Sequence, residues 1–263
     1  MTTVADILQY VETLAPRTMK MEWDNVGLLC GSRGTAVNRL LVALDPFEGV
    51  CREAADWGAE LIVTHHPLIF NPLTSVTDET DVGRSVGILC RHGISAIAAH
   101  TNLDCAPGGV NDCLAAKLGL SGVRVIHPEG VDGEGREWGL LRRGTVPEQT
   151  LDGFLGFVRA ALGCEGLRYA DGGKPVHIVA VGGGACGSEL MQAVEAGCDT
   201  FVTSDIKYND FWDARAQGLN LIDAGHFYTE NPVVSMLAGK IAAAFPEVQV
   251  KISESHRDCM KFF

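Results

Sequence analysis

The chain has 263 residues, enough for one or two domains at the usual roughly 100–200 residues per domain. Hydrophobic residues make up 46% and charged residues 21%, a composition typical of globular proteins and not of disordered chains. The net charge of −12 argues against binding to nucleic acid or to an anionic membrane surface, because the long-range field repels both. No apolar run approaches the roughly 20 residues that cross a bilayer. The first residues carry no basic region or cleavage site typical of export, so we expect a cytoplasmic protein.

The nine cysteines also favour a cytoplasmic protein. Their number is odd and no two are spaced as CxxC, which argues against both a disulfide framework and a structural zinc site. We expect reduced, mostly buried thiols.

The first half of the chain alternates helices and strands. Residues 4–14 place apolar side chains at helical spacing and are followed by Pro16. A strand is predicted at 38–45, a helix at 52–59 and a strand at 60–66. Continuous apolar strands alternating with helices predict a parallel sheet covered on both faces.

The same order returns downstream, as a strand at 176–184, a helix at 188–197 and a strand at 199–205. Both copies end their second strand with the pattern G-x-[DE]-x-x-V-T. Further on, RHGISAIAAHTNLD at 91–104 matches AQGLNLIDAGHFYTE at 216–230, and each segment contains a histidine followed four residues later by an acid. Four matching elements in one order indicate a duplicated α/β unit.

The predicted fold class is therefore α/β with two similar lobes, each a mostly parallel or mixed sheet covered by helices. Between the copies, 124–175 contains a predicted strand at 137–146 and a predicted helix at 150–163, bounded by Gly/Asp turns. We assign this region to the second lobe. The predicted boundaries are 1–123 with 231–263 for the first lobe and 124–230 for the second.

Metal-ligating side chains gather where predicted strands end. In parallel α/β sheets the carboxyl edge is where ligands bind. Imidazoles and carboxylates together suit zinc, iron or manganese, and their number fits two metals with open positions for water or substrate. His65 and His66 would point to opposite sides of an extended segment, so two neighbouring metals could take one each. The candidates are His65, His66, His100, Asp104, His226 and Glu230.

A glycine-rich turn offers a rival interpretation. Residues 182–187, GGGACG, fit the GxGxxG pattern of a dinucleotide site, and Asp205 ends the following strand. The corresponding turn of the first copy, 44–47, is not rich in glycine, and glycines also serve tight strand-to-helix turns. A phosphate-cradling role of the loop stays open.

Two polar segments are candidates for lining a substrate cleft. Glu22, Trp23, Asp24 and Asn25 precede the first strand, where the pattern alone favours a capped loop around a core tryptophan. Lys207 and Tyr208 follow a predicted strand end, and the alternative for them is a solvated helix start.

The ordered motifs EWDNVGLLCG, LIVTHHPLIF, AAHTNLDCAPGGVND, TSDIKYND and DAGHFYTE resemble those of the GTP cyclohydrolase 1 type 2 homologues, also called Nif-three-like proteins. The resemblance runs from the first helix to about residue 240. It implies a two-lobed subunit with a dinuclear metal site between the lobes. It also implies a hexameric ring built as a trimer of dimers. The chain lacks the extra regulatory-like domain that longer members carry between the lobes.

Carried over by motif, the resemblance implies that Glu230 bridges two divalent ions and that His100 lies close to them. The implied ligands are His65, His66, Asp104, His226 and Glu230. The leading hypothesis is a metal-dependent hydrolase of a small nucleotide-like or heterocyclic substrate, with His100 as the catalytic proton carrier. The alternatives are a non-enzymatic metal-binding or ring-shaped adaptor protein and, more weakly supported, a Rossmann-type NAD(P) enzyme.

Overall fold

The computed structural model describes residues 1–263 as a mixed α/β protein whose sheets are covered by helices. None of its helices is both long and apolar enough to cross a membrane. Its internal packing divides the chain into two compact units. Residues 107–123, which the sequence prediction assigns to the first lobe, pack in the second unit, where Leu114 and Leu118 join a buried cluster with Val179. The first unit comprises Met1–Ala106 and Val234–Arg257, and the second Pro107–Val233 and Asp258–Phe263.

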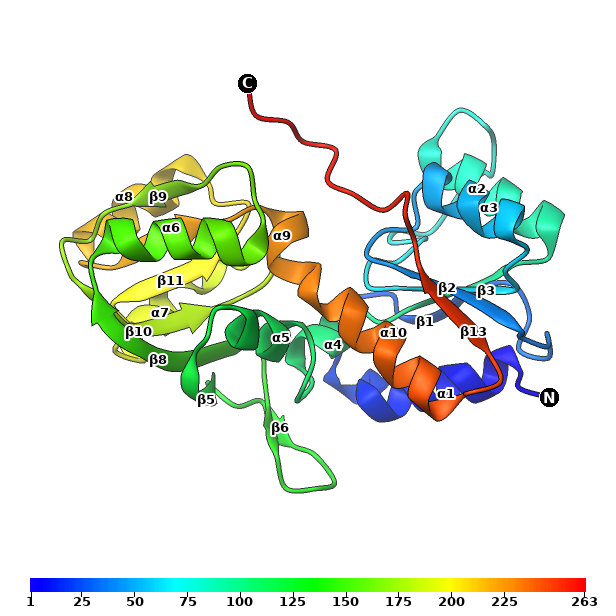
Figure 1. The fold of residues 1–263 in the computed structure, drawn as a ribbon, viewed down its shortest axis with the longest axis horizontal. Coiled ribbons are helices and arrows are strands. Elements are labelled where there is room, and N and C mark those ends of the chain that lie inside the picture. The colour runs from blue at the N-terminus through cyan, green and yellow to red at the C-terminus, as the bar shows by residue number, and fades with distance from the viewer. The chain divides into compact units, whose positions relative to one another are not determined.

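The first unit contains a five-stranded sheet in the order β1-β4-β3-β2-β13, parallel except for β1. Helices α2 and α3 cover one face, and α1 and α10 lie on the other (Figure 1). The strands are β1 (Gly27–Cys30), β2 (Arg39–Ala43), β3 (Leu61–Thr64), β4 (Ser95–Ala98) and β13 (Gln249–Ile252). The helices are α1 (Val4–Leu14), η1 (Arg17–Met19), α2 (Glu48–Trp57), α3 (Asp81–His92), α4 (Thr101–Cys105) and α10 (Pro232–Ala244), within which the division between units falls.

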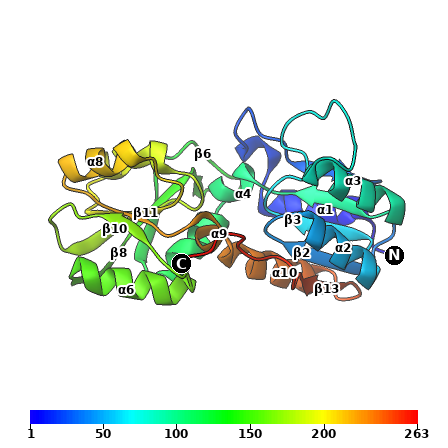
Figure 2. The ribbon, with the colours of Figure 1, turned by 90° about the horizontal axis from the view of Figure 1, so that it is seen from above.

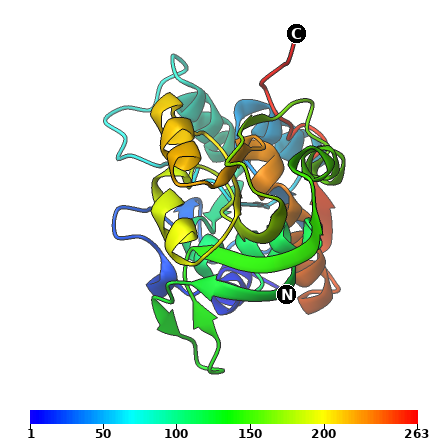
Figure 3. The ribbon, with the colours of Figure 1, turned by 90° about the vertical axis from the view of Figure 1, so that its left-hand side faces the viewer.

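The second unit contains a six-stranded sheet in the order β5-β8-β10-β11-β12-β9, with β10, β11 and β12 parallel. Helix α6 lies on one face and α8 on the other (Figure 2), and α7 lies on the side of α8 (Figure 3). The strands are β5 (Ser121–Ile126), β8 (Leu141–Gln149), β9 (Arg168–Ala170), β10 (Val176–Val181), β11 (Thr200–Thr203) and β12 (Asn220–Asp223), with a small hairpin of β6 (Gly130–Val131) and β7 (Glu137–Trp138). The helices are α5 (Val110–Lys117), α6 (Leu151–Leu162), η2 (Gly187–Glu189), α7 (Leu190–Glu195), α8 (Tyr208–Ala216) and α9 (His226–Glu230).

The two units repeat one chain path. In the first unit the order β2-α2-β3-α3-β4-α4 forms three parallel strands, and β10-α7-β11-α8-β12-α9 does the same in the second. An antiparallel strand borders the third strand of each set, β1 beside β4 and β9 beside β12. The predicted duplication is thus confirmed at the level of topology, and each copy ends in a five-residue helix at the carboxyl edge of its sheet.

A partly buried carboxylate connects the C-terminal strand and the residues after it to helix α2 of the first unit. Glu53 on α2 accepts hydrogen bonds from the Ser253 hydroxyl at 2.6 Å and from the backbone N–H groups of Glu254 and Ser255 at 3.1 and 2.9 Å, and it pairs with Lys251 at 3.1 Å. Burial alone would raise the pKa of Glu53, but these hydrogen bonds outweigh it and lower the pKa to about 2. A depressed pKa of this kind stabilises the fold above the unfolded value of 4.5, and the stabilisation disappears as the pH falls toward 2.

We therefore expect Glu53→Gln to lower the free energy of unfolding at neutral pH by about 2–3 kcal/mol. The difference from wild type should shrink as the pH falls, because the wild-type carboxyl is then protonated too. Urea unfolding across a pH series measures this. Asp56→Asn, an exposed carboxylate on the same helix, is the matched control and should leave stability nearly unchanged. A pH-independent difference for Glu53→Gln would contradict the prediction.

Candidate metal centre

The first half-site consists of His65, His66, His100 and Asp104, all at the carboxyl edge of the sheet in the first unit. His65 and His66 follow β3 directly, and His100 is the N-cap residue of α4 after β4. The backbone N–H of Asp104 donates to the carbonyl oxygen of His100 at 3.0 Å, which places this carboxylate one helical turn after the imidazole. The parallel strands and the short helix thus bring side chains from two sequence motifs to one place.

The three imidazoles of the first half-site converge. One ring nitrogen from each of His65, His66 and His100 lies within 4.8 Å of the others. Asp104 Oδ1 lies 3.6 Å from His65 Nε2. The strand alternation expected for His65 and His66 does not apply, because β3 ends at Thr64 and the chain bends there, with the Thr64 hydroxyl donating to the His66 carbonyl oxygen at 2.7 Å. Their ring centroids are only 4.9 Å apart.

The second half-site consists of His226 and Glu230 on α9 of the second unit. The helical spacing predicted from the sequence places both on one face, with His226 Nε2 3.1 Å from Glu230 Oε2. The Glu230 side chain is almost fully buried, whereas that of His226 is about a third exposed. A buried carboxylate beside an imidazole is a pair that a cation would stabilise.

All four histidines use Nδ1 in the same way. The Nδ1–H of His65 donates to the backbone carbonyl oxygen of Ala99 at 2.9 Å. Each of the other three donates to a carboxylate: His66 to Asp45 at 2.6 Å, His100 to Asp24 at 2.8 Å and His226 to Asp205 at 2.7 Å. These acceptors fix the neutral ring in the tautomer whose lone pair is on Nε2. This is the arrangement by which proteins orient histidine ligands of metals, so the residues present fit a divalent metal.

Asp24 is held as an anion beside His100. It is buried, and it accepts hydrogen bonds from the backbone N–H and the hydroxyl of Thr101 at 3.0 and 2.5 Å as well as from His100. Burial would raise the pKa of Asp24, but the hydrogen bonds from His100 and Thr101 outweigh it and lower the pKa to about 2. Asp24 can therefore orient the ring of His100 and balance a positive charge on it.

The glycine-rich turn at 182–187 packs against Glu230 of the second half-site. The N–H of Gly183 donates to Asn111 Oδ1 at 2.6 Å, and that of Gly184 donates to Thr229 Oγ1 at 3.0 Å, so neither is directed to a phosphate. Gly184 has a φ of +67°, and a Cβ there would lie 2.1 Å from Glu230 Oε1. The close approach of the backbone to Glu230 accounts for the glycine, which removes the main support for a dinucleotide site.

The residues predicted to line a substrate cleft differ in their exposure and contacts. Trp23 is 63% exposed and packs edge-on against Phe70 and His100, with ring centroids 5.8 and 6.3 Å apart. Glu22 is exposed beside it, and Asn25 donates a hydrogen bond to the Ile69 carbonyl oxygen at 2.6 Å. In the second unit Lys207 precedes α8, and Tyr208, its first residue, is 76% exposed.

The sequence interpretation missed Asp45 and Asp205 as partners of histidines. Both follow the carboxyl end of a parallel strand, β2 and β11, so the rule that located the histidines could also have found them. Asp205 has a φ of +52°, a conformation rare outside glycine, and this conformation accompanies its hydrogen bond to His226.

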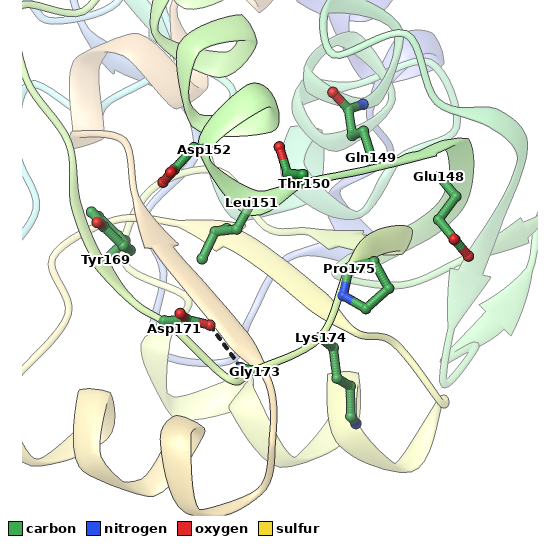
Figure 4. A pocket seen from close by; sticks show the side chains of 10 residues that line it. All are labelled: Glu148, Gln149, Thr150, Leu151, Asp152, Tyr169, Asp171, Gly173, Lys174 and Pro175. Carbon is green, nitrogen blue, oxygen red and sulfur yellow. Dashed lines mark hydrogen bonds between the residues drawn. The ribbon is translucent and has the colours of Figure 1, made fainter.

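A cavity of about 650 Å³ in the second unit contains none of these residues. It lies between the start of α6 and the loop after β9, and Figure 4 shows Thr150, Asp152, Tyr169 and Lys174 among its lining side chains. Its walls contain no histidine or cysteine. The histidine clusters are therefore the better candidates for metal chemistry.

We expect Asp45→Ala to weaken divalent-metal affinity by about 10–100-fold, the usual effect of removing the partner that orients a histidine ligand. Asp45→Asn should have a smaller effect, because an amide oxygen still accepts from His66. Competition with a chromogenic chelator measures both. Asp78→Ala, which removes an exposed carboxylate of the same unit, is the control. Wild-type affinity in Asp45→Ala would show that His66 needs no such partner.

Relatives with assigned names match the whole chain. A protein of Clostridium perfringens named GTP cyclohydrolase 1 type 2 homolog is 34% identical over 262 residues, covering 98% of both chains. A protein of Streptomyces coelicolor with the same name is 36% identical and covers 92% of this chain and 86% of its own. The match thus extends over both units.

Solved structures and a family model agree with this match. The Bacillus cereus protein related to NIF3 superposes with a TM-score of 0.94 at 26% identity, covering 100% of this chain and 99% of its own. A Staphylococcus aureus hypothetical protein gives a TM-score of 0.92 at 29% identity, covering 99% of each chain. The family model for Duf34/NIF3 (NGG1p interacting factor 3) matches residues 2–259. The chain belongs to the Duf34/NIF3 family.

Proposed function

We propose that this protein is a dinuclear metal-dependent hydrolase that acts on a small nucleotide-like or heterocyclic substrate, in the manner of a cyclohydrolase. The observation that carries the proposal is the common anchoring of His65, His66, His100 and His226 through Nδ1, which directs each Nε2 lone pair away from its anchor. The relatives in Clostridium perfringens and Streptomyces coelicolor are both named GTP cyclohydrolase 1 type 2 homolog, which supports the reaction class.

In the proposed centre the two half-sites together hold two divalent ions of zinc, iron or manganese. His65, His66 and Asp104 of the first unit and His226 and Glu230 of the second would hold these ions. Such a pair of ions supplies Lewis acidity and activates water for hydrolysis when bound. The proposal also includes the hexameric ring and the cytoplasmic location that are expected from the sequence.

His100 is the proposed proton carrier. Its Nδ1–H is fixed on Asp24, so Nε2 is the atom that takes a proton from the attacking water and returns it to the leaving group. Asp24 stays ionised throughout and stabilises the imidazolium that forms. Trp23 and Phe70 pack edge-on against the ring of His100, and we propose that Trp23, Glu22 and Asn25 border the substrate together with Lys207 and Tyr208.

The deciding experiment begins with elemental analysis of the protein purified without chelator. We expect about two divalent metals per chain. The apoprotein is then reloaded with each metal and screened against nucleoside triphosphates, free heterocycles and phosphoesters, with release of formate as the signal for ring opening. Turnover that rises with metal content supports the proposal. A protein that holds no metal and cannot be loaded contradicts it.

The variant His100→Gln tests whether His100 acts as a proton carrier or as a metal ligand. We expect the variant to keep its metals while turnover falls by about 10²–10⁴-fold, because glutamine cannot carry a proton. Elemental analysis and turnover on the same preparation give both readouts. Loss of the metals would assign His100 as a ligand instead, and unchanged turnover would exclude its catalytic role.

An adaptor function is the second candidate, since the family description names an interacting factor. It predicts that the fully loaded protein converts nothing in the panel and that pull-downs recover a stoichiometric partner. Turnover on any substrate class at full metal load excludes it as the sole function.

A further inference from the structure

Two thiols of the first unit lie side by side, away from the histidines. Cys30 at the end of β1 and Cys90 in the last turn of α3 have their sulfur atoms 4.0 Å apart. Cys90 is exposed, and Cys30 is partly buried. Fifty-nine residues separate them in the sequence, so the fold alone brings them together.

A local irregularity of β1 directs Cys30 toward α3. The pairing of β1 with β4 shifts register between Leu28 and Cys30. In a regular strand Leu29 and Cys30 would point to opposite faces, but both pack against the buried cluster that α3 covers. A bulge of this kind re-aims a side chain. The next residue, Gly31, has a φ of +93° and lies so close to Ser95 that a Cβ would come within 2.2 Å of its hydroxyl, which fixes the chain there.

We propose that Cys30 and Cys90 form a dithiol that a hydroperoxide oxidises reversibly to an intramolecular disulfide. A sulfur–sulfur separation of 4.0 Å requires small side-chain rotations to reach the roughly 2.05 Å of a bond. This site is independent of the metal centre and of the proposed hydrolase activity.

The reaction balances in two steps. The exposed sulfur of Cys90 attacks the peroxide, whose O–O bond breaks, and Cys90 becomes a sulfenic acid while one water or alcohol leaves. The sulfur of Cys30 then attacks the sulfur of Cys90, the S–S bond forms, the S–O bond breaks, and the hydroxyl leaves as water with the proton of Cys30. The two thiols lose two electrons and two protons, and the peroxide takes up both.

The order of the two steps follows from the surroundings of each thiol. Burial, with a contribution from Cys90, raises the pKa of Cys30 to about 11, so Cys30 reacts poorly with the oxidant by itself. Cys90 meets solvent directly.

The test treats the full-length protein with hydrogen peroxide in the presence of a chelator, which suppresses metal-catalysed oxidation. Alkylation and non-reducing peptide mapping should then find Cys30 joined to Cys90, with a mass lower by two hydrogen atoms and full recovery on adding dithiothreitol. The oxidised form should also unfold at a higher temperature, on the order of 5–10 °C, because the bond closes a long loop.

Matched variants decide between the possible outcomes. Cys30→Ser and Cys90→Ser should abolish both the linked peptide and the rise in unfolding temperature, whereas Cys259→Ser, which removes another exposed cysteine, should preserve both. Separate alkylation of Cys30 and Cys90 in folded, peroxide-treated protein would overturn the proposal. So would linkage of Cys90 to a second chain instead of to Cys30.

Discussion

Replacing Glu230 by alanine is expected to leave the purified protein with less than about a tenth of the metal that the wild type carries. Glu230 is almost fully buried, and its carboxylate lies 3.1 Å from His226. Under the proposed function Glu230 would help to hold both ions, so the substitution would weaken the binding of each. Elemental analysis of wild type and variant prepared side by side gives the ratio directly.

Glu148→Ala is the matched control, since it removes an exposed carboxylate of the same unit that lines the cavity in Figure 4. It should retain the wild-type metal content. Thermal unfolding in excess chelator checks that Glu230→Ala is folded. A folded Glu230→Ala protein that carries as much metal as the wild type would refute the shared role of this carboxylate, while leaving His65, His66 and His100 as a separate site.

The repeated core of the fold could be predicted from the sequence because its signals are local. The strands and helices from β2 to β3 and from β10 to β11 carry apolar runs and helical periods that need no knowledge of the rest of the chain. The edge strands β1, β9 and β13 could not be predicted in this way. They have three or four residues each, and only their pairing with β4, β12 and β2 makes them strands.

The candidate ligands could also be predicted, since histidines and acids at the carboxyl ends of parallel strands fall at one edge of each sheet. Their orientation could not. The strand-end rule would place Asp45 and Asp205 at the same edges, but it does not show that each accepts a hydrogen bond from a histidine, because a lone carboxylate after a strand is more often solvated. The convergence of His65 and His66 likewise depends on the residue at which β3 ends. If the strand were longer, the two side chains would point to opposite faces, and the end of a strand is difficult to predict to within one residue.

Gly184 offers a test of the second half-site that removes no ligand atom. Its backbone is fixed on both sides: the N–H donates to Thr229, and the carbonyl oxygen accepts from the backbone N–H and hydroxyl of Ser204 at 3.0 and 2.7 Å. A Cβ at this position would overlap Glu230 Oε1 at 2.1 Å and lie 3.2 Å from His226 Nε2. Since the backbone is held in place, the side chain of Glu230 must move.

We therefore expect Gly184→Ala to lower metal affinity by at least about tenfold and to cost about 1–2 kcal/mol of apoprotein stability, since alanine is strained at a φ of +67°. Chelator competition measures the first effect, and urea unfolding with and without metal measures the second. Gly156→Ala on the exposed face of α6, where a Cβ meets nothing within 4 Å, is the matched control and should stabilise the helix slightly without affecting the metal. A Gly184→Ala protein with reduced stability but wild-type metal affinity would contradict the prediction. In that case the glycine is needed only for the backbone conformation, and Glu230 can bind the metal from another position.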